Sequence, residues 1–389
     1  MSSTDSDLSS AGADSTPSAG VAPIQGFEQA ATDTEAARHW QPVSDRKIRV
    51  GIAGYGVCGF GAAFHFQDHP NVRIAAVADL DPAKGAELAR LCRCATIYPT
   101  CEELIADDSV EAVFVATDAP SHARLAIAAL QAGKHVASAV PAVFGSLEEA
   151  DALFAAARSS DRHYMMFETS YFHHDLYCMR EMYRQGDLGE VIYAEGEYWH
   201  YFGTPLAAHR GWRTGLPPQW YPTHSNAYYT GVTGGSFTEV SCMGMPSALE
   251  HLQPENNAYN NPFGTEIALF RTSEGGMARM AVSWDTPGEG GERGRIRTRQ
   301  GTYYGEFQSG HEAGAVAELS RPPLPPGVDA GGHGGSHGYL MSEFVEAILM
   351  DRTPLIDVAQ ALNMTVGGIV AHESALKDGE LLKIPQYAL

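Results

Sequence analysis

A glycine-rich turn that directly follows an apolar run is the feature that most constrains this chain. Residues 48–53 read Ile-Arg-Val-Gly-Ile-Ala, and Gly54, Gly56 and Gly59 follow at the spacing G-x-G-x-x-G. Glycines at this spacing let the backbone approach a pyrophosphate and place that group at the N-terminus of the next helix. We therefore predict a dinucleotide at this turn and a helix that opens within Gly59–Phe66. The predicted phosphate-binding turn also contains Tyr55, Val57 and Cys58.

The residues after the turn support a dinucleotide and indicate which one. A second apolar run, Val72–Ala78, ends at Asp79. A carboxylate at this place accepts hydrogen bonds from the adenosine ribose and repels a 2′-phosphate, so NAD is favoured over NADP. Asp81 is a rival for the ribose, although Leu-Asp-Pro is more typical of a helix cap. A tight turn without a ligand is the structural alternative.

Composition excludes several classes of function. The chain has 389 residues, 44% of them apolar, which is enough for two hydrophobic cores. A net charge of −21 argues against nucleic acid and anionic membranes as partners. Without an apolar stretch of about 18 residues or a signal peptide, we expect a soluble cytoplasmic protein. The spacing of Cys92, Cys94 and Cys101 is not that of a zinc site, and no metal is expected.

The pattern of elements changes along the chain. From residue 47 short buried strands alternate with helices, which predicts a doubly wound parallel sheet, the Rossmann arrangement. After about residue 170 strands follow one another with turn signals and no intervening helices, which predicts an open, mostly antiparallel sheet in an α/β domain. Residues 322–337 are predicted to be a glycine-rich loop before two C-terminal helices. The expected divisions are a disordered tail (1–23), an N-terminal arm (24–46), the NAD-binding domain (47–168) and a substrate-binding and oligomerisation domain (169–389).

Three further motifs join the glycine turn. They are Ala-Val-Ala-Asp-Leu-Asp at 76–81, Val-Ala-Thr-Asp-Ala-Pro-Ser-His at 115–122 and Ala-Gly-Lys-His-Val at 132–136. With these motifs, residues 47–389 resemble the glucose–fructose oxidoreductase, inositol dehydrogenase and MocA (Gfo/Idh/MocA) family. The resemblance implies a sugar or polyol above the nicotinamide and an open sheet that builds dimers or tetramers. It also implies cofactor contacts for Thr117, Ala119 and His122, although His122 is equally suited to cap the next helix.

The chain departs from the usual family pattern at two places. Ala139-Val140-Pro141 stands where Glu-Lys-Pro is common, and Trp220 stands where an aspartate usually precedes His224 by four residues. Alcohol dehydrogenation by that acid–base set is therefore doubtful. The chain more closely resembles the NAD-dependent glycosidases of the family, which include α-N-acetylgalactosaminidases and sulfoquinovosidases. The shared segments are Met-Met-x-Glu at 165–168, Tyr-Pro-Thr-His at 221–224 and His-Gly-Gly at 333–335.

That resemblance implies hydrolysis through transient oxidation of the sugar at C3, loss of the C2 proton, departure of the C1 substituent, water addition and re-reduction. His224 is then the candidate base at C3, or alternatively a core histidine. Tyr171 is the candidate base at C2, or an aromatic packed beneath the cleft. Tyr221 is placed to donate to the ketone or to pack. Glu168 is expected on the nicotinamide ribose or a sugar hydroxyl, or in a salt bridge at the strand end.

The basic residues near these motifs indicate an anionic substrate. Arg210, Trp212 and Arg213 lie shortly before Tyr221 in a very acidic chain. Guanidinium groups suit sulfonate, phosphate or carboxylate, and an indole offers a face to a sugar ring, so a sulfoquinovoside is favoured. The alternative is that both arginines pair with surface carboxylates. The remaining predicted substrate contacts are His174 and a flexible lid that carries His333 and His337.

Two other functions stay open at this level. An NAD-dependent sugar 3-dehydrogenase would use the same cofactor fold. A non-catalytic NAD-bound sensor would explain the missing lysine and aspartate.

Overall fold

The computed structural model of the chain describes residues 39–389 apart from 57–58, 187, 205–210, 305–306 and 311–318. The predicted tail and most of the predicted arm lie outside the described residues. The same holds for three predicted site residues, Val57, Cys58 and Arg210.

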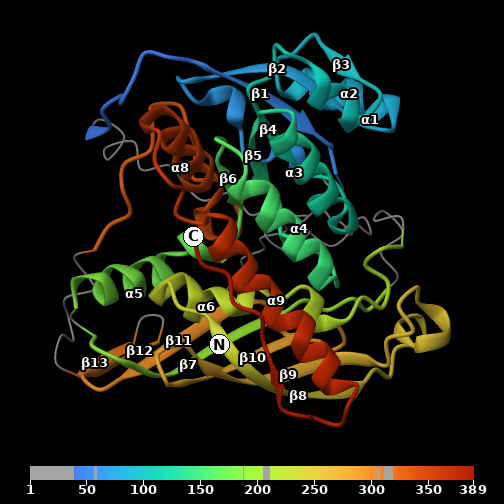
Figure 1. Cartoon of the computed structure of the whole chain (residues 1–389), viewed down its shortest axis with the longest axis vertical. Helices are drawn as coiled ribbons and strands as arrows, with labels where there is room; N and C mark the ends of the chain where they lie inside the picture. Colours follow the sequence, from blue (N-terminus) through green and yellow to red (C-terminus); the bar gives the residue numbers. More distant parts are fainter. Residues whose placement is uncertain (1–38, 57–58, 187, 205–210, 305–306, 311–318) are drawn as a thin grey trace, which may run out of the picture.

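The first sheet has six parallel strands in the order β3-β2-β1-β4-β5-β6, with helices on both faces (Figure 1). Its central strands are apolar and buried, as expected for a sheet that is covered on both faces. This confirms the predicted doubly wound arrangement. The strands are β1 (Ile48–Ala53), β2 (Val72–Ala78), β3 (Ile97–Tyr98), β4 (Ala112–Val115), β5 (His135–Ser138) and β6 (Tyr164–Met166).

The helices of this part begin at capping side chains. Asp81 accepts from the backbone N–H of Ala83, and Pro82 occupies the first helical position. Asp81 is therefore the cap of α1, as its Leu-Asp-Pro context suggested. Thr100 and Ser146 cap α2 and α4 in the same way. The helices are α1 (Pro82–Leu91), α2 (Cys101–Ala106), α3 (His122–Gln131) and α4 (Leu147–Arg158).

The predicted helix after the glycine turn is wrong. Two short 3₁₀ turns, Phe60–Ala62 and Phe66–Asp68, stand there, and His65 between them has a φ of 52°. The break has a packing reason. Phe64 and Phe66 both pack on Phe114, at ring-centroid distances of 5.0 and 5.3 Å. Residues two apart do not face the same way on an α-helix, so one continuous helix could not bury both rings there.

The second sheet has eight strands in the order β13-β12-β11-β7-β10-β9-β8-β14. Its pairs are antiparallel except for β7 with β10, so the prediction of an open, mostly antiparallel sheet is confirmed. The strands are β7 (Val191–Trp199), β8 (Phe237–Pro246), β9 (Phe263–Thr272), β10 (Met277–Ser283), β11 (Gly291–Thr298), β12 (Gly301–Tyr304), β13 (Phe307–Gly310) and β14 (Leu382–Lys383).

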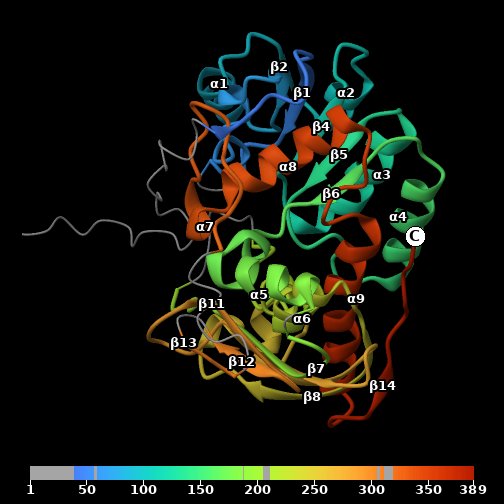
Figure 2. The same cartoon turned by 90° about the vertical axis from the view of Figure 1, so that its left-hand side faces the viewer.

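Among the described residues, helices cover one face of the second sheet, the face turned toward the first sheet (Figures 1 and 2). They are α5 (His174–Gln185), α6 (Thr223–Thr233) and α9 (Val358–Ala375). The expectation of no helices in this region is wrong for α5 and α6. Residues 223–232 of α6 are all buried, so this helix has no polar face and its sequence lacks the amphipathic period that reveals a helix.

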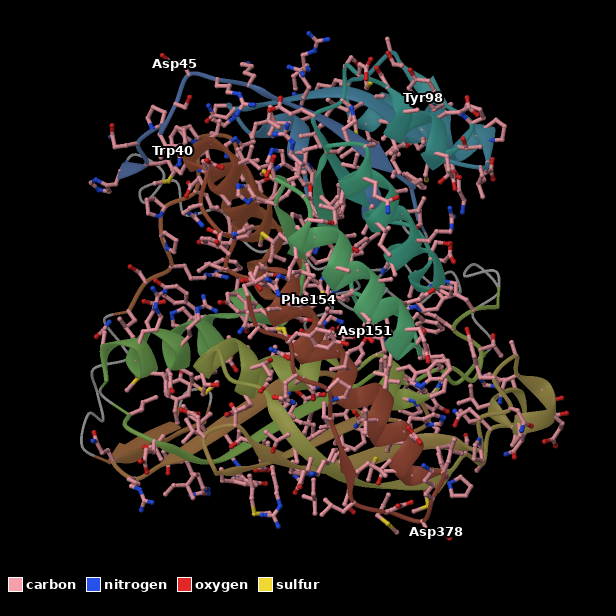
Figure 3. All side chains as sticks on the ribbon, viewed as in Figure 1. Trp40, Asp45, Tyr98, Asp151, Phe154 and Asp378 are labelled. Carbon is pink, nitrogen blue, oxygen red and sulfur yellow. The ribbon has the colours of Figure 1, made fainter. Side chains whose placement is uncertain are left out.

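The C-terminal part of the chain returns to the first sheet. A short turn, α7 (Gly332–Gly335), leads into α8 (His337–Met350). The ring of Phe344 on α8 lies 5.9 Å from that of Phe167, which belongs to the aromatic cluster of Phe64, Phe66 and Phe114. The last residues lie along α4, where Tyr387 donates to Asp151 at 2.8 Å and packs on Phe154 (Figure 3). No helix in the described part of the chain is long and apolar enough to cross a bilayer.

Candidate active site

The glycine turn forms a cradle of the kind that a pyrophosphate needs. Gly54 has a φ of 99°, and a Cβ there would lie 3.0 Å from the carbonyl oxygen of Ala116. Gly56 also has a left-handed backbone, with a φ of 72°. Asp79 accepts from the backbone N–H of Tyr55 at 2.8 Å and from that of Asp81 at 2.8 Å. The carboxylate at the end of β2 thus holds the turn in shape, and the cradle fits a dinucleotide.

The loop after β4 lies at the same sheet edge. Thr117 is half-buried and Ala119 is buried. His122 is 1% exposed, and its two ring nitrogens lie 2.9 Å from the Pro141 carbonyl oxygen and 3.2 Å from that of Thr117. The predicted cofactor contact of His122 is therefore wrong, because the ring is enclosed and braces the loops that follow β4 and β5. Those loops flank the cradle.

The centre of the site is an imidazole between two carboxylates. His224, in the first turn of α6, donates from Nδ1 to Glu168 Oε1 at 2.7 Å, and Glu292 Oε1 lies 3.6 Å from the same nitrogen. Glu168 follows β6 and Glu292 lies on β11, so three distant segments meet here. Ser170 supports both acids, because its N–H donates to Glu168 at 2.9 Å and its hydroxyl donates to Glu292 at 2.6 Å.

The two acids decide the charge of the imidazole. Burial lowers the pKa of His224, but the charges of Glu168 and Glu292 outweigh burial and raise the pKa to about 9. Burial raises the pKa of Glu168, yet His224 holds it below its ordinary value. His224 is thus an imidazolium at neutral pH, and the prediction of a base that titrates near neutrality is wrong. The ion pair of Glu168 with His224 matches the salt-bridge alternative, and its contact with the nicotinamide ribose or a sugar hydroxyl stays a prediction.

An arginine and three aromatic rings form the wall beside His224. Arg213 donates to the hydroxyl of Tyr221 at 3.0 Å, and its guanidinium lies 4.7 Å from the ring centroids of both Trp212 and Tyr221. The rings of Tyr198 and Tyr221 lie 4.6 and 5.6 Å from that of His224. Arg213 Nε is buried without a hydrogen-bond partner, and no carboxylate of the described residues forms an ion pair with Arg213. The alternative of a surface ion pair is therefore wrong for Arg213.

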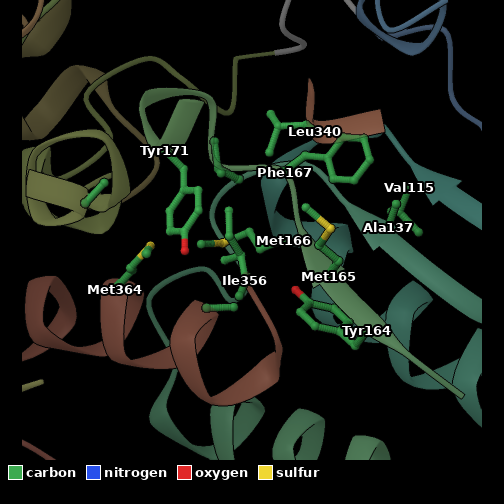
Figure 4. Packing of buried hydrophobic residues seen from close by; sticks show 14 of the residues in the cluster. Val115, Ala137, Tyr164, Met165, Met166, Phe167, Tyr171, Leu340, Ile356 and Met364 are labelled. Atoms are coloured by element: carbon green, nitrogen blue, oxygen red, sulfur yellow. The ribbon is translucent and has the colours of Figure 1, made fainter. Parts of the chain in front are cut away.

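Tyr171 does not reach this site. Its ring is 5% exposed, and the guanidinium of Arg180 lies 3.9 Å from the ring centroid. Met166, Ile356 and Met364 lie around it in the core (Figure 4). Burial raises the pKa of its hydroxyl, which further removes it from base chemistry. The packing alternative for Tyr171 is the one observed, and its catalytic role stays a prediction.

The predicted histidine contacts divide into two groups. His174 is exposed and donates to the carbonyl of Leu319 at 3.2 Å, away from His224. Its neighbour His173 faces the site instead, with Nε2 3.4 Å from Glu292 Oε2. His337 is 2% exposed and begins α8, and His333 lies 2.8 Å from it. The flexible lid is therefore wrong for these two histidines, because helix packing holds His337.

One member of the site, Glu292, was missed from the sequence. Glu292 lies in a Gly-Glu-Arg-Gly segment that reads as an exposed hairpin, and its register opposite Tyr198 on β7 is visible only in the sheet. His173 is the N-cap residue of α5 and faces the site, whereas His174, the first residue of that helix, is exposed. The sequence pattern did not reveal which of the two histidines faces the site.

Comparisons with known proteins agree with the fold. The model of the Gfo/Idh/MocA family, an oxidoreductase family with an NAD-binding Rossmann fold, matches residues 48–168. A glycosyl hydrolase family 109 protein of Saccharopolyspora erythraea is 24% identical over 87% of this chain and 83% of its own length. Glycosyl hydrolase family 109 protein 2 of Akkermansia muciniphila is 26% identical over 78% of this chain and 75% of its own length.

Solved structures share the same architecture. Apo scyllo-inositol dehydrogenase from Lactobacillus casei superposes with a TM-score of 0.69 at 16% identity, over 88% of this chain and 99% of its own. Levoglucosan dehydrogenase in complex with NADH and levoglucosan has a TM-score of 0.69 at 17% identity, over 88% of this chain and all of its own. Residues 48–168 therefore belong to the NAD-binding Rossmann fold of the Gfo/Idh/MocA oxidoreductase family.

Proposed function

We propose that this NAD-dependent enzyme is a glycoside hydrolase that cleaves its substrate by transient oxidation at C3, elimination, water addition and re-reduction. The relatives named glycosyl hydrolase family 109 support this function. The observation that carries it is the imidazolium of His224 between Glu168 and Glu292. Oxidation of a sugar alcohol needs only a base, whereas departure of a glycosidic oxygen also needs an acid.

The residues of the chain divide the work. Gly54, Gly56 and Asp79 would hold the cofactor, and NAD would supply reversible hydride transfer with the sugar. Glu168 and Glu292 both contact His224 at Nδ1, so the Nε2 proton is the one that His224 gives to the leaving oxygen. Glu168 and Glu292 stabilise the cation until that proton leaves. Val140 is buried at the position where other members of the family carry a lysine. The base that this lysine would supply must therefore come from another residue of the site.

We further propose an anionic sugar such as a sulfoquinovoside as the substrate. Arg213 supports this choice because its described partners are aromatic rings and phenols rather than acids. A guanidinium in such surroundings gains most from a charged ligand with several oxygens.

The test is a panel of aryl glycosides, anionic and neutral, with NAD supplied well below the substrate concentration. We expect release of more aglycone than there is NAD, without growth of NADH absorbance. NADH formed in step with product would instead identify a sugar 3-dehydrogenase. Tight NAD binding with no turnover of any sugar would identify a non-catalytic sensor.

A further inference from the structure

A second buried carboxylate contacts the segment that leads to His224. Glu266, on β9, has no exposed surface. Its Oε2 accepts from the backbone N–H of Gln219 at 2.8 Å, and its Oε1 lies 2.7 Å from Nδ1 of His372 on α9. Both carboxylate oxygens are therefore held by protein groups, and neither takes part in the chemistry proposed above.

Gln219 is fixed by its side chain as well as by its backbone. The residue is fully buried in the 3₁₀ turn Pro218–Trp220. Its side-chain amide lies 3.4 Å from the carbonyl oxygen of Glu266 and 3.3 Å from that of Met280, on the neighbouring strand β10. The N–H groups at the start of a helix lack partners within it, and a buried one that is left unpaired is costly. The Glu266 carboxylate supplies the acceptor here.

Helix α9 touches the same segment. A Cβ on Gly368 would lie 2.0 Å from the carbonyl oxygen of Gln219 and 2.5 Å from Cγ of Pro222. The carbonyl oxygen of Met364 accepts from the side chain of Asn226 on α6 at 2.7 Å. The segment that leads into α6 is thus held by β9, β10 and α9 together.

The path from this turn to the site is short and stiff. Tyr221 N–H donates to the carbonyl oxygen of Pro218 at 3.1 Å, and Pro222 is the N-cap of α6, two residues before His224. Proline fixes its own φ, and three prolines stand in this stretch, at positions 217, 218 and 222. A displacement of the turn is therefore passed on to Tyr221 and His224.

The geometry around His224 tolerates little displacement. Its Nδ1 lies 2.7 Å from Glu168 and 3.6 Å from Glu292, and the hydroxyl of Tyr221 accepts from Arg213 at 3.0 Å. A misplacement of about 1 Å that begins far from the chemistry can lower the rate about 100-fold.

We propose that Glu266 is a positioning residue of the site, which fixes Gln219 and so keeps His224 against its two carboxylates. A buried ion pair is weak evidence for stability, because apolar residues of similar volume are often as stable. The pair of Glu266 with His372 is better explained by the position that it gives to the turn. The proposal rests on the proposed function, in which His224 is the acid.

The first test needs no substrate. NMR titration of the full-length protein, with His224→Gln for assignment, measures the pKa of His224, on which two carboxylates and Arg213 act. Glu266→Met keeps the length of the side chain but removes both acceptors. It should lower the pKa of His224 by roughly 1 or more, because the imidazole moves away from its carboxylates. Glu266→Gln keeps an acceptor for Gln219 and should retain the wild-type pKa.

Glu343→Met is the matched control for loss of stability. Glu343, on α8, is 8% exposed, pairs with Arg352 and accepts from the backbone N–H of Leu355 at 2.9 Å. Its loss removes the same kinds of contact as the loss of Glu266. We expect a comparable fall in Tm, with the pKa of His224 and kcat unchanged.

A second variant decides the inference if Glu266→Met does not fold. His372→Phe keeps a ring against Trp220, 5.7 Å away in the wild type, but removes the partner of Glu266 Oε1. It should lower the pKa of His224 and kcat in the same direction as Glu266→Met, by less. Wild-type values of both quantities in His372→Phe would then overturn the proposal.

The second test uses turnover at a temperature well below the Tm of every variant. Glu266→Met should lower kcat roughly 10- to 100-fold, with a smaller change in KM and an unchanged Kd for NAD. Glu266→Gln should stay within a few-fold of the wild type. A folded Glu266→Met protein with wild-type kcat and a wild-type pKa of His224 refutes the role. The same holds if Glu343→Met loses as much kcat. A wild type without any turnover refutes the proposed function, and the pKa measurement then decides this inference alone.

Discussion

At the scale of single residues, the site is defined by His224 between the carboxylates of Glu168 and Glu292. His224 was identified from the Tyr-Pro-Thr-His motif, but its charge was not, because Glu168 and Glu292 act on it from other elements. Arg213 was identified from its composition context, and its aromatic surroundings strengthen the assignment. The motif did not predict where the Tyr171 ring points. A shift of one position along the 3₁₀ turn Thr169–Phe172 decides whether a ring faces the cleft or the core.

The charge of His224 predicts a pH dependence. Its pKa is raised to about 9, so the acid is protonated at lower pH and kcat/KM should fall as the pH rises through that value. Glu168→Gln removes the larger of the two charges that raise this pKa, and the alkaline limb should move to lower pH by roughly 1–3 units. The measurement is the pH profile of aglycone release. An unmoved limb in the variant would show that another group is the acid.

Arg213 predicts a change in substrate preference. Arg213→Met removes a charge-assisted hydrogen bond worth about 1.5–3 kcal/mol to an anionic sugar, so kcat/KM for that sugar should fall roughly 10- to 100-fold. Neutral glycosides should lose much less. Arg271→Met, at an exposed arginine paired with Glu239 on the second sheet, is the control. Equal losses for anionic and neutral sugars would exclude recognition of the anion by Arg213.

At the scale of elements, the segment after β1 departs most from expectation. The Rossmann pattern predicts a helix, but Phe64 and Phe66 both pack on Phe114, and one continuous helix could not place both rings there. The elements that the sequence did predict are those with strong local signals, such as the capped helices α1 and α4 and the buried parallel strands. α6 was missed because burial on every side removed its amphipathic period, although it carries His224.

The close packing of this segment predicts a sensitive glycine. A Cβ on Gly61 would lie 2.0 Å from the carbonyl oxygen of Gly54, so Gly61→Ala must displace the cofactor turn. Overpacking of this kind costs about 1–3 kcal/mol, and we expect roughly a tenfold or larger rise in the Kd for NAD. Gly85→Ala in α1, where the nearest atom to a Cβ would be 3.3 Å away, is the control. Calorimetric titration with NAD measures both variants, and an unchanged Kd for Gly61→Ala would contradict the packing.

At the scale of the whole molecule, the arrangement in two sheets could be predicted from the sequence. Strands that alternate with helices differ in pattern from strands that follow one another through turns. The meeting of β6, α6 and β11 at one point could not, because it depends on strand order and register over more than a hundred residues. No local pattern places Glu292 opposite Tyr198. This long-range meeting is also why the site was predicted only in part.

The uncovered face of the second sheet supports the predicted homo-oligomer. Adjacent strands β8 and β9 present a patch of exposed apolar side chains there, with Met243 opposite Ile267 in the register. Apolar patches of this kind mark interfaces. Sedimentation of the wild type should give the mass of two or four chains, and a variant with Ile267→Glu and Leu269→Glu should shift toward one chain. A wild type that sediments as a single chain at micromolar concentration would contradict this prediction.

The most direct test of the whole account is hydrolysis in deuterated water, with the released sugar examined by mass spectrometry and NMR. Elimination and re-addition exchange the C2 proton with solvent, so the account predicts one deuterium at C2 and no accumulation of NADH. A sugar released with hydrogen still at C2 would contradict the account, because its glycosidic bond would have broken without the oxidised intermediate.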